Sequence, residues 1–162
     1  MTRIPGSKNG FTLIELLVVI TIIGILVSLV VANFSSGRER ARDAVRKSDL
    51  DSIKKGLYMY YSDKQTYPTA QANAGLFYGC GIGTQACPVQ GAFATSTTTY
   101  MKQIPADPLY NGGTPTYVYV QVSANDYYIY ADLENGADSD IAASQDRCNV
   151  SPTATAYVVC ND

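Results

Sequence analysis

Residues 10–31 read GFTLIELLVVITIIGILVSLVV, and this stretch decides the fold of the chain. From Phe11 to Val31 it holds 21 residues, of which Glu15 is the one ionisable side chain. As an α-helix this run would be about 32 Å long, enough to cross a bilayer core of about 30 Å. A helix that is apolar on every face is unusual in the core of so small a protein. We therefore expect residues 11–34 to form a transmembrane helix.

A secretory signal peptide is the alternative interpretation of the same segment. Arg3 and Lys8 could supply its basic start, but its apolar core would hold only about 7–15 residues and would end in a small-residue cleavage site. Here the apolar run is longer, and Val31-Ala32-Asn33-Phe34 is a poor site of that kind. We therefore favour a membrane helix.

Glu15 needs a partner, because a carboxylate inside a transmembrane helix costs a few kcal/mol. If Glu15 lies near the membrane edge, its side chain can reach the headgroups. If the chain is cut after Gly10, Phe11 gains a free α-amine one helical turn from Glu15. The amine and the carboxylate could then neutralise each other within one chain or between neighbouring chains, and a pair between chains would fix their axial register.

The segment from Gly10 to Glu15, followed by the apolar residues 16–20, resembles the processing site of type IV prepilins and of type II secretion prepseudopilins. The resemblance rests on Gly10, on Phe11 and on Glu15 as the fifth residue after the cut. It implies that a prepilin peptidase removes residues 1–10 as a leader and that Phe11 is then N-methylated. It also implies that Glu15 engages the Phe11 amine of an adjacent subunit, and that the apolar helices pack as the core of a filament.

The same resemblance implies where the protein works and with what. The chain would cross the inner membrane once with an extracytoplasmic head, and would then enter a periplasmic or cell-surface filament made of its own copies. Expected partners are the prepilin peptidase, the inner-membrane assembly platform, minor pilins or pseudopilins, and membrane lipid. The formal net charge of −2, from 12 basic and 14 acidic side chains, gives no reason to expect binding to nucleic acid.

A basic run after the apolar segment conflicts with this orientation, because the positive-inside rule places the flank richer in Lys and Arg in the cytosol. Two basic residues precede the helix, whereas the run that follows it holds five, namely Arg38, Arg40, Arg42, Arg46 and Lys47. We give more weight to the prepilin-like leader and to the cysteines. The basic run is then expected to meet lipid headgroups or acidic faces of neighbouring subunits, so that charge reversal at Arg38 and Arg42 impairs assembly and leaves the monomer folded.

The helix is expected to continue beyond the membrane and to pack on a β-rich head. No strong helix breaker occurs from residue 12 to 61, and residues 35–61 are the amphipathic continuation of the helix. A stripe at helical spacing is expected to dock on a sheet, and it consists of Leu50, Ile53, Leu57 and Tyr60/Tyr61. The remaining residues, 62–162, are expected to form the globular head.

Within the head, Tyr117–Val122 and Tyr127–Ala131 are β-rich runs separated by Ser-Ala-Asn-Asp, which predicts a hairpin. Thr155–Cys160 is expected to add a third strand, and residues 69–99 to form a long loop region. The predicted fold class is α+β, with a long N-terminal helix, transmembrane in its first half, packed on a small antiparallel sheet. This layout is type IV pilin-like, and its strands and acidic loop resemble those of the major pseudopilins.

The four cysteines predict an oxidising compartment. They are separated as C-x6-C and C-x11-C, which does not fit the short knuckles of zinc sites, and they are Cys80, Cys87, Cys148 and Cys160. In an exported domain four cysteines indicate two disulfides. Three connectivities are open, of which the sequential one is the simplest, and free buried thiols are the alternative.

The acidic stretch from Asp132 to Asp140 is a candidate calcium site. It packs several oxygen ligands into nine residues, and calcium takes six to eight oxygens. The spacing is not that of an EF-hand. Major pseudopilins carry a calcium site in the corresponding loop, and the resemblance implies Asp138 and Asp140 as its ligands in this chain. The alternative is a solvated acidic turn.

Composition excludes catalysis that depends on histidine. The chain has no histidine, which removes Ser-His-Asp and Cys-His catalysis, and no nucleophile–base pair or phosphate-binding glycine loop is visible. We expect a structural subunit of a type IV filament, either a type IV pilus subunit or a type II secretion major pseudopilin, and not an enzyme. The alternative is a membrane-anchored extracytoplasmic binding module, an adhesin or receptor with a Tyr-rich head, which does not polymerise.

Overall fold

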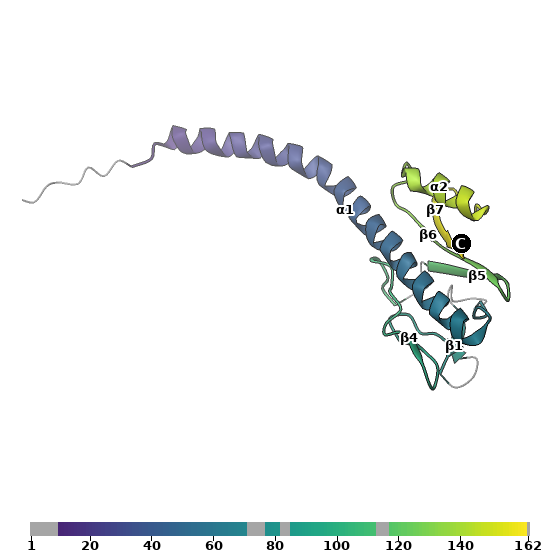
Figure 1. Ribbon diagram of the computed structural model, residues 1–162. Helices are drawn as coiled ribbons and strands as arrows, with labels where there is room; N and C mark the ends of the chain where they lie inside the picture. The colour runs from purple at the N-terminus through teal and green to yellow at the C-terminus, as the bar shows by residue number, and fades with distance from the viewer. Residues whose placement is uncertain (1–9, 71–76, 82–84, 113–116, 162) are drawn as a thin grey trace, which may run out of the picture. The chain divides into compact units, whose positions relative to one another are not determined.

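The computed structural model describes residues 10–70, 77–81, 85–112 and 117–161, apart from the side chains of residues 29–33. In chain order, these residues form α1 (Leu13–Lys64), β1 (Tyr78–Cys80), β2 (Gln85–Ala86), β3 (Phe93–Ala94), β4 (Thr99–Met101), β5 (Tyr117–Ser123), β6 (Asp126–Asp132), α2 (Ser139–Cys148) and β7 (Ala156–Cys160) (Figure 1). A long N-terminal helix and small antiparallel sheets confirm the α+β fold class predicted from the sequence.

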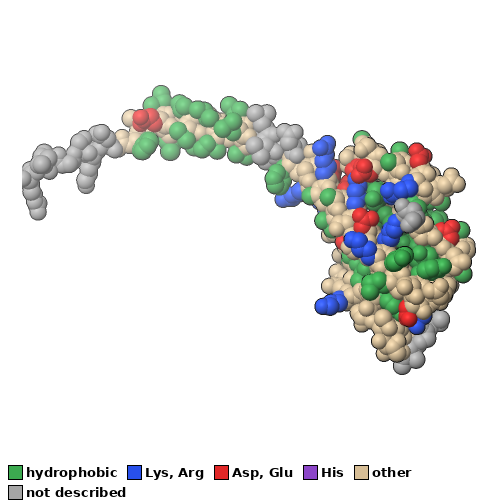
Figure 2. Space-filling view, in the orientation of Figure 1, with side chains coloured by type: hydrophobic (Ala, Val, Ile, Leu, Met, Phe, Trp, Pro, Cys, Tyr) green, Lys and Arg blue, Asp and Glu red, His purple; other side chains and the backbone are tan. Residues whose placement is uncertain are grey.

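The chain divides into two compact units, and the boundary lies between Arg38 and Glu39, inside α1. In the first unit the described apolar side chains of α1 are exposed, from Leu13 to Val27, and Figure 2 shows them along this part of the helix. Within the described residues we find no helix that is long and apolar enough to cross a membrane. The expected membrane span, residues 11–34, includes residues 29–33, whose side chains are outside the described part of the structure. Residues 1–9 of the expected leader are also outside it.

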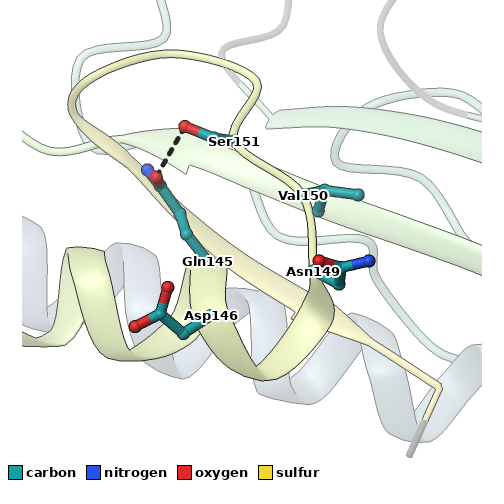
Figure 3. A pocket seen from close by; sticks show the side chains of 5 residues that line it. All are labelled: Gln145, Asp146, Asn149, Val150 and Ser151. Atoms are coloured by element: carbon teal, nitrogen blue, oxygen red, sulfur yellow. Dashed lines mark hydrogen bonds between the residues drawn. The ribbon is translucent and has the colours of Figure 1, made fainter.

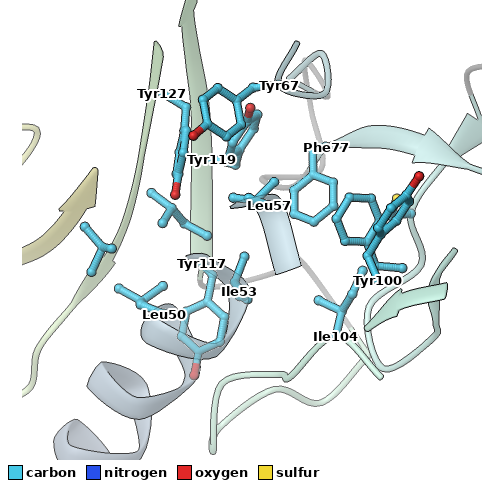
Figure 4. Packing of buried hydrophobic residues seen from close by; sticks show 14 of the residues in the cluster. Leu50, Ile53, Leu57, Tyr67, Phe77, Tyr100, Ile104, Tyr117, Tyr119 and Tyr127 are labelled. Atoms are coloured by element: carbon cyan, nitrogen blue, oxygen red, sulfur yellow. The ribbon is translucent and has the colours of Figure 1, made fainter. Parts of the chain in front are cut away.

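The second unit includes the C-terminal part of α1, which supplies one side of the head's core. Leu50, Ile53 and Leu57 are at most 1% exposed, so the stripe predicted from the sequence docks as expected. It joins one buried cluster with the inward face of an antiparallel sheet of order β5-β6-β7. Figure 4 shows the stripe facing a core that is largely aromatic, with Tyr67, Phe77, Tyr100, Tyr117, Tyr119 and Tyr127 around it.

The three-stranded sheet follows the predicted strands closely. β5 and β6 form the hairpin with Tyr119 opposite Ile129, and β7 adds to β6 with Val159 opposite Ile129. Buried tyrosines need a partner for the hydroxyl group. Tyr119 donates to the carbonyl of Pro68 at 2.8 Å, and Tyr117 donates to Asp49 on α1 at 2.6 Å. The tyrosines of the sheet therefore both fill the core and hydrogen-bond to segments that surround it.

The prediction of a long loop over residues 69–99 is wrong in part. β1 pairs with β2 and β3 pairs with β4, as two short antiparallel ribbons. Strands of two or three residues are too short to show a periodic pattern in the sequence, so tertiary contacts decide them. Phe77 and Phe93 are buried edge to face with ring centroids 4.8 Å apart, and Phe93 also stacks on Tyr60 of α1 at 5.4 Å.

The second helix, α2, was not predicted from the sequence. Asp138 caps its first turn, because its carboxylate accepts the backbone N–H of Asp140 at 2.9 Å. The helix ends at Asn149, which adopts a left-handed conformation with φ of 52°. Asp138 and Asp140, which we placed in an acidic loop, thus lie at the start of a helix.

Truncation of the stripe on α1 tests this packing. Leu57→Ala removes a fully buried side chain and leaves a cavity in the core, so we expect a loss of about 2–5 kcal/mol in the free energy of unfolding. The control is Met59→Ala, two residues along the same helix, where the side chain is 51% exposed and the expected change is within about 0.5 kcal/mol. Urea unfolding of the full chain in detergent micelles measures both. Equal losses in the two variants would contradict the docking of this stripe.

Candidate functional site

The residues proposed for processing and assembly lie at the start of α1. Gly10 and Phe11 precede the helix and are exposed, with Phe11 at 90%. The peptide bond between them is therefore accessible in the described structure. Phe11, Ile14, Glu15 and Val18 line a shallow, mainly apolar depression on this end of the helix.

Thr12 and Glu15 form a reciprocal cap at this helix start. The backbone N–H and the hydroxyl of Thr12 both donate to Glu15 Oε2, at 2.9 and 2.8 Å. In return, Thr12 Oγ1 accepts the backbone N–H of Glu15 at 3.3 Å. This is a capping box, a T-x-x-E pattern that we did not use in reading the sequence. Within a single chain, Glu15 therefore already has hydrogen-bond partners.

A second constellation lies in the head, where α1 meets the acidic stretch after β6. Its centre is Arg46, whose side chain is 3% exposed. Arg46 donates from Nε to Asp107 Oδ2 at 2.5 Å and from Nη2 to Asp107 Oδ1 at 3.2 Å. Its Nη1 donates to Asp43 Oδ1 and to Glu134 Oε1, both at 2.7 Å. The guanidinium thus binds three carboxylates, and those of Asp43 and Asp107 are themselves buried.

Asp43 links this ion-pair cluster to the backbone of the acidic stretch. Its two oxygens accept the backbone N–H groups of Glu134 and Asn135, each at 2.9 Å. Glu134 also binds Arg42, which donates from Nε at 2.7 Å and from Nη2. Side chains of α1 therefore hold residues 134–135 by both charge and backbone hydrogen bonds. Figure 2 shows basic and acidic side chains gathered on one face of the head.

The charge state of the ion-pair cluster follows from these contacts. Burial lowers the pKa of Arg46, but the hydrogen bonds to Asp107, Glu134 and Asp43 outweigh it, so the pKa is raised and the guanidinium stays charged. The hydrogen bond from Arg42 is the main cause that lowers the pKa of Glu134 to about 2. Arg46 and Glu134 are therefore both charged at neutral pH.

The structure places the predicted calcium ligands beside a lysine of α1. Lys47 Nζ donates to both oxygens of Asp138 at 2.8 Å and to Asp140 Oδ2 at 2.7 Å. These bonds, chiefly the one from Lys47, lower the pKa of Asp138. The two carboxylates thus lie around one ammonium group. Among the described residues, no group of three or more His, Cys, Asp or Glu side chains is arranged to hold a metal ion.

The basic run divides into residues with different contacts. Arg38 lies over the ring of Phe34, 4.9 Å from its centroid, whereas Arg42, Arg46 and Lys47 bind carboxylates of the head. The joint prediction for Arg38 and Arg42 therefore needs a correction. Because Arg42 binds Glu134, its charge reversal is expected to disturb the head itself as well as assembly.

The cysteines pair sequentially. Cys80 bonds to Cys87 and Cys148 bonds to Cys160, and no cysteine is free. This confirms the prediction of two disulfides. The first ties β1 to the chain just after β2, and the second ties the end of α2 to the end of β7.

A polar depression at the end of α2 contains none of the predicted site residues. Figure 3 shows its lining, formed by Gln145, Asp146, Asn149, Val150 and Ser151. Ser151 donates to Gln145 Oε1 at 2.7 Å, and Gln145 Nε2 donates to the carbonyls of Thr153 and Ala156. These bonds fasten the connection between α2 and β7.

Sequence reasoning missed the ion-pair cluster, although a signal for it was present. Asp43 and Arg46 precede Leu50 at helical spacing, so they continue the buried stripe toward the N-terminus. We expected the basic run that includes Arg46 to meet lipid headgroups or acidic faces of neighbouring subunits. Charged residues in register with an apolar stripe indicate instead a buried pair, whose partners come from elsewhere in the chain.

Comparison with known proteins gives a consistent picture. Residues 6–31 match the family model described as the prokaryotic N-terminal methylation motif. The chain is 34% identical to the type II secretion system core protein G of Escherichia coli (strain K12) over 149 residues, which cover 91% of this chain and 94% of that protein. It is 35% identical to the protein of the same name from Aeromonas hydrophila over 101 residues, 62% of this chain and 67% of that one. No solved structure gives a significant match.

Removal of Asp107 tests the ion-pair cluster. Asp107→Ala leaves the buried guanidinium of Arg46 without its bidentate partner, so we expect the free energy of unfolding to fall by about 3 kcal/mol or more. Asp51→Ala, which removes an exposed carboxylate from α1, is the control and is expected to stay within about 0.5 kcal/mol of the wild type. Denaturant unfolding of both variants measures the difference. A loss for Asp107→Ala no larger than that of the control would refute a structural role for the cluster.

Acid titration tests the Arg42–Glu134–Arg46 contact. The pKa of Glu134 is about 2 in the folded protein and near 4.5 when unperturbed, so its stabilisation is complete above pH 4.5 and is lost as the pH falls toward 2. We expect the midpoint of thermal unfolding to fall over this interval, and to fall less steeply in Glu134→Gln. The measurement is a series of melts of both proteins between these pH values. Parallel curves for the two proteins would show that Glu134 does not contribute.

Proposed function

The chain belongs to the family of type II secretion system core protein G, the major pseudopilins, and from this premise we propose that it is the structural subunit of a type II secretion pseudopilus. The observation that carries the proposal is the similarity along nearly the whole chain, which includes both the N-terminal segment and the head. A surface type IV pilus was the other member of the class favoured by the sequence. The named relatives favour the pseudopilus.

The proposed maturation step acts at the exposed bond between Gly10 and Phe11. A prepilin peptidase removes residues 1–10, and Phe11 is N-methylated. The N-terminal methylation motif over residues 6–31 and the exposure of both residues support this step.

The proposed assembly step uses the exposed apolar half of α1. Residues 11–34 first lie in the inner membrane and then pack against the same segment of neighbouring subunits. Both environments are apolar, which suits side chains that the isolated chain leaves exposed. Glu15 then exchanges its bonds to Thr12 for the Phe11 amine of an adjacent subunit, so that the carboxylate has a partner both before and after assembly.

The proposed role of the ion-pair cluster is to couple the head to the helix. A subunit that leaves the membrane is moved through its helix, and the head has to follow it. Arg46 on α1 binds the carboxylates of Asp107 and Glu134 in the head, and Asp43 accepts the backbone N–H of Glu134, so that separation of helix and head would leave a buried guanidinium without partners. This role requires no catalysis by the chain.

The proposed location is the inner membrane, crossed once, with the head on the periplasmic side and later in a periplasmic filament. The two disulfides support an oxidising compartment for the head. The proposed partners are other copies of the chain, minor pseudopilins, the prepilin peptidase, the inner-membrane assembly platform and membrane lipid.

Mass spectrometry of the N-terminal peptide, combined with crosslinking in cells, tests this function. In envelope fractions of cells that secrete through this system, we expect the wild-type chain to begin at methylated Phe11 and to crosslink into ladders of its own copies. Glu15→Gln is expected to be cleaved at the same bond but to give few crosslinks, because it cannot neutralise the amine of a neighbour. Asp51→Asn, which removes an exposed carboxylate farther along α1, is the control and keeps the ladder.

Two results would count against the proposal. If the wild-type chain keeps residues 1–10 while the peptidase is active, the chain is not processed as a pseudopilin. If the processed chain remains monomeric while secretion proceeds, it is a tethered module that does not polymerise.

A further inference from the structure

Basic side chains of α1 form salt bridges with several carboxylates of the acidic stretch, residues 132–140. Three of the carboxylates that this stretch carries, those of Glu134, Asp138 and Asp140, bind Arg42, Arg46 or Lys47. The fourth, Asp132, accepts the hydroxyl groups of Thr153 and Thr155 through one oxygen. The acidic stretch therefore has partners within the chain itself.

This donor set does not fit the calcium ion that the family resemblance implied for Asp138 and Asp140. Calcium needs six to eight oxygens at about 2.3–2.6 Å around one centre. Here three oxygens of the two aspartates already surround Lys47 Nζ at 2.7–2.8 Å, which is the distance of charge-assisted hydrogen bonds. The nearby carboxylate of Glu134 is turned to the guanidinium groups of Arg42 and Arg46.

Packing also holds the side chain of Lys47 in this position. Its side chain is 20% exposed, so most of the stem is covered by the head. The ring of Tyr157 on β7 lies 5.5 Å from Nζ and adds a cation–π contact. An ammonium held in this way cannot be withdrawn without uncovering both the stem and the carboxylates.

We propose that the Lys47 ammonium is the resident cation of this loop and takes the place that a calcium ion would otherwise fill. It ties the N-terminal end of α2 to α1, while the disulfide Cys148–Cys160 ties the other end of α2 to β7. The head then keeps its fold without metal.

Two features make a single ammonium sufficient against two carboxylates. Asp138 also accepts the backbone N–H of Asp140, and both aspartates lie at the N-terminal end of α2, where the helix dipole favours negative charge. Burial alone lowers the pKa of Lys47, but the bonds to Asp138 and Asp140 raise it overall, so the cation persists at neutral and mildly alkaline pH. Because the cation is covalently attached, the attachment of the loop does not depend on the concentration of a free ion.

Thermal melts of the full chain in detergent micelles, in EGTA and in about 1 mM calcium chloride, test the proposal. We expect the wild type to melt at the same temperature in both buffers. Lys47→Met keeps the length of the stem and removes the charge, and is expected to melt about 3 °C or more below the wild type in EGTA. The matched control is Lys55→Met, two turns farther along α1, where the side chain is exposed and the melting temperature should not change.

Three results would overturn the proposal. One is a higher melting temperature of the wild type in calcium than in EGTA. Another is a Lys47→Met variant that melts with the wild type in EGTA. The third is calorimetric binding of one equivalent of calcium by the wild type, which needs no variant and therefore decides the matter even if Lys47→Met fails to fold. Since all three measurements use the purified chain, they do not depend on whether it polymerises.

Discussion

The burial of Arg46 is the constraint on which the rest of the head depends. A guanidinium that is 3% exposed is tolerated only when several acceptors surround it, and here Asp43, Asp107 and Glu134 come from three separate parts of the chain. The requirement for all three fixes the position of α1 against the segment before β5 and against the residues after β6. Packing of Leu50, Ile53 and Leu57 buries apolar surface, but the hydrophobic effect is non-directional and does not by itself fix the position of the helix. The ion-pair cluster adds a geometric constraint, because hydrogen bonds depend on angle as well as on distance.

The rest of the head is built on tyrosine and disulfides, because few large aliphatic side chains are available to it. Tyr117 and Tyr119 fill the interior while their hydroxyl groups bind Asp49 and the carbonyl of Pro68. The short ribbons β1-β2 and β3-β4 would be marginal on their own. The disulfide Cys80–Cys87 and the aromatic contacts of Phe77 and Phe93 hold them to the core. α2 and β7 are joined in a similar way by the second disulfide.

The N-terminal half of α1 differs from the head in that its apolar side chains are exposed. Its described large apolar side chains, from Leu13 to Val27, are exposed, and its one carboxylate, that of Glu15, is bound by Thr12 at the helix start. The segment therefore forms a regular helix, but its apolar side chains are not buried. Under the proposed function, a lipid bilayer and then a bundle of identical helices would supply apolar surroundings for these side chains. In the described part of the head, in contrast, every buried side-chain nitrogen and oxygen has a hydrogen-bond partner.

Sequence patterns alone predicted the long helix, the prepilin-like motif around Gly10 and Phe11, the stripe from Leu50 to Leu57, the hairpin and third strand of the main sheet, and two disulfides. These features are local or periodic, so neighbouring residues encode them. The pairing of the cysteines, the short ribbons, and the contacts of Arg46 and Lys47 with carboxylates about 60 to 90 positions away depend on long-range contacts and became visible in the folded chain. α2 was missed because an acidic stretch indicates a loop until its cap and its packing on β7 are known. The charge of a side chain is known from its residue type, whereas its ion-pair partner depends on which distant segments the fold brings next to it.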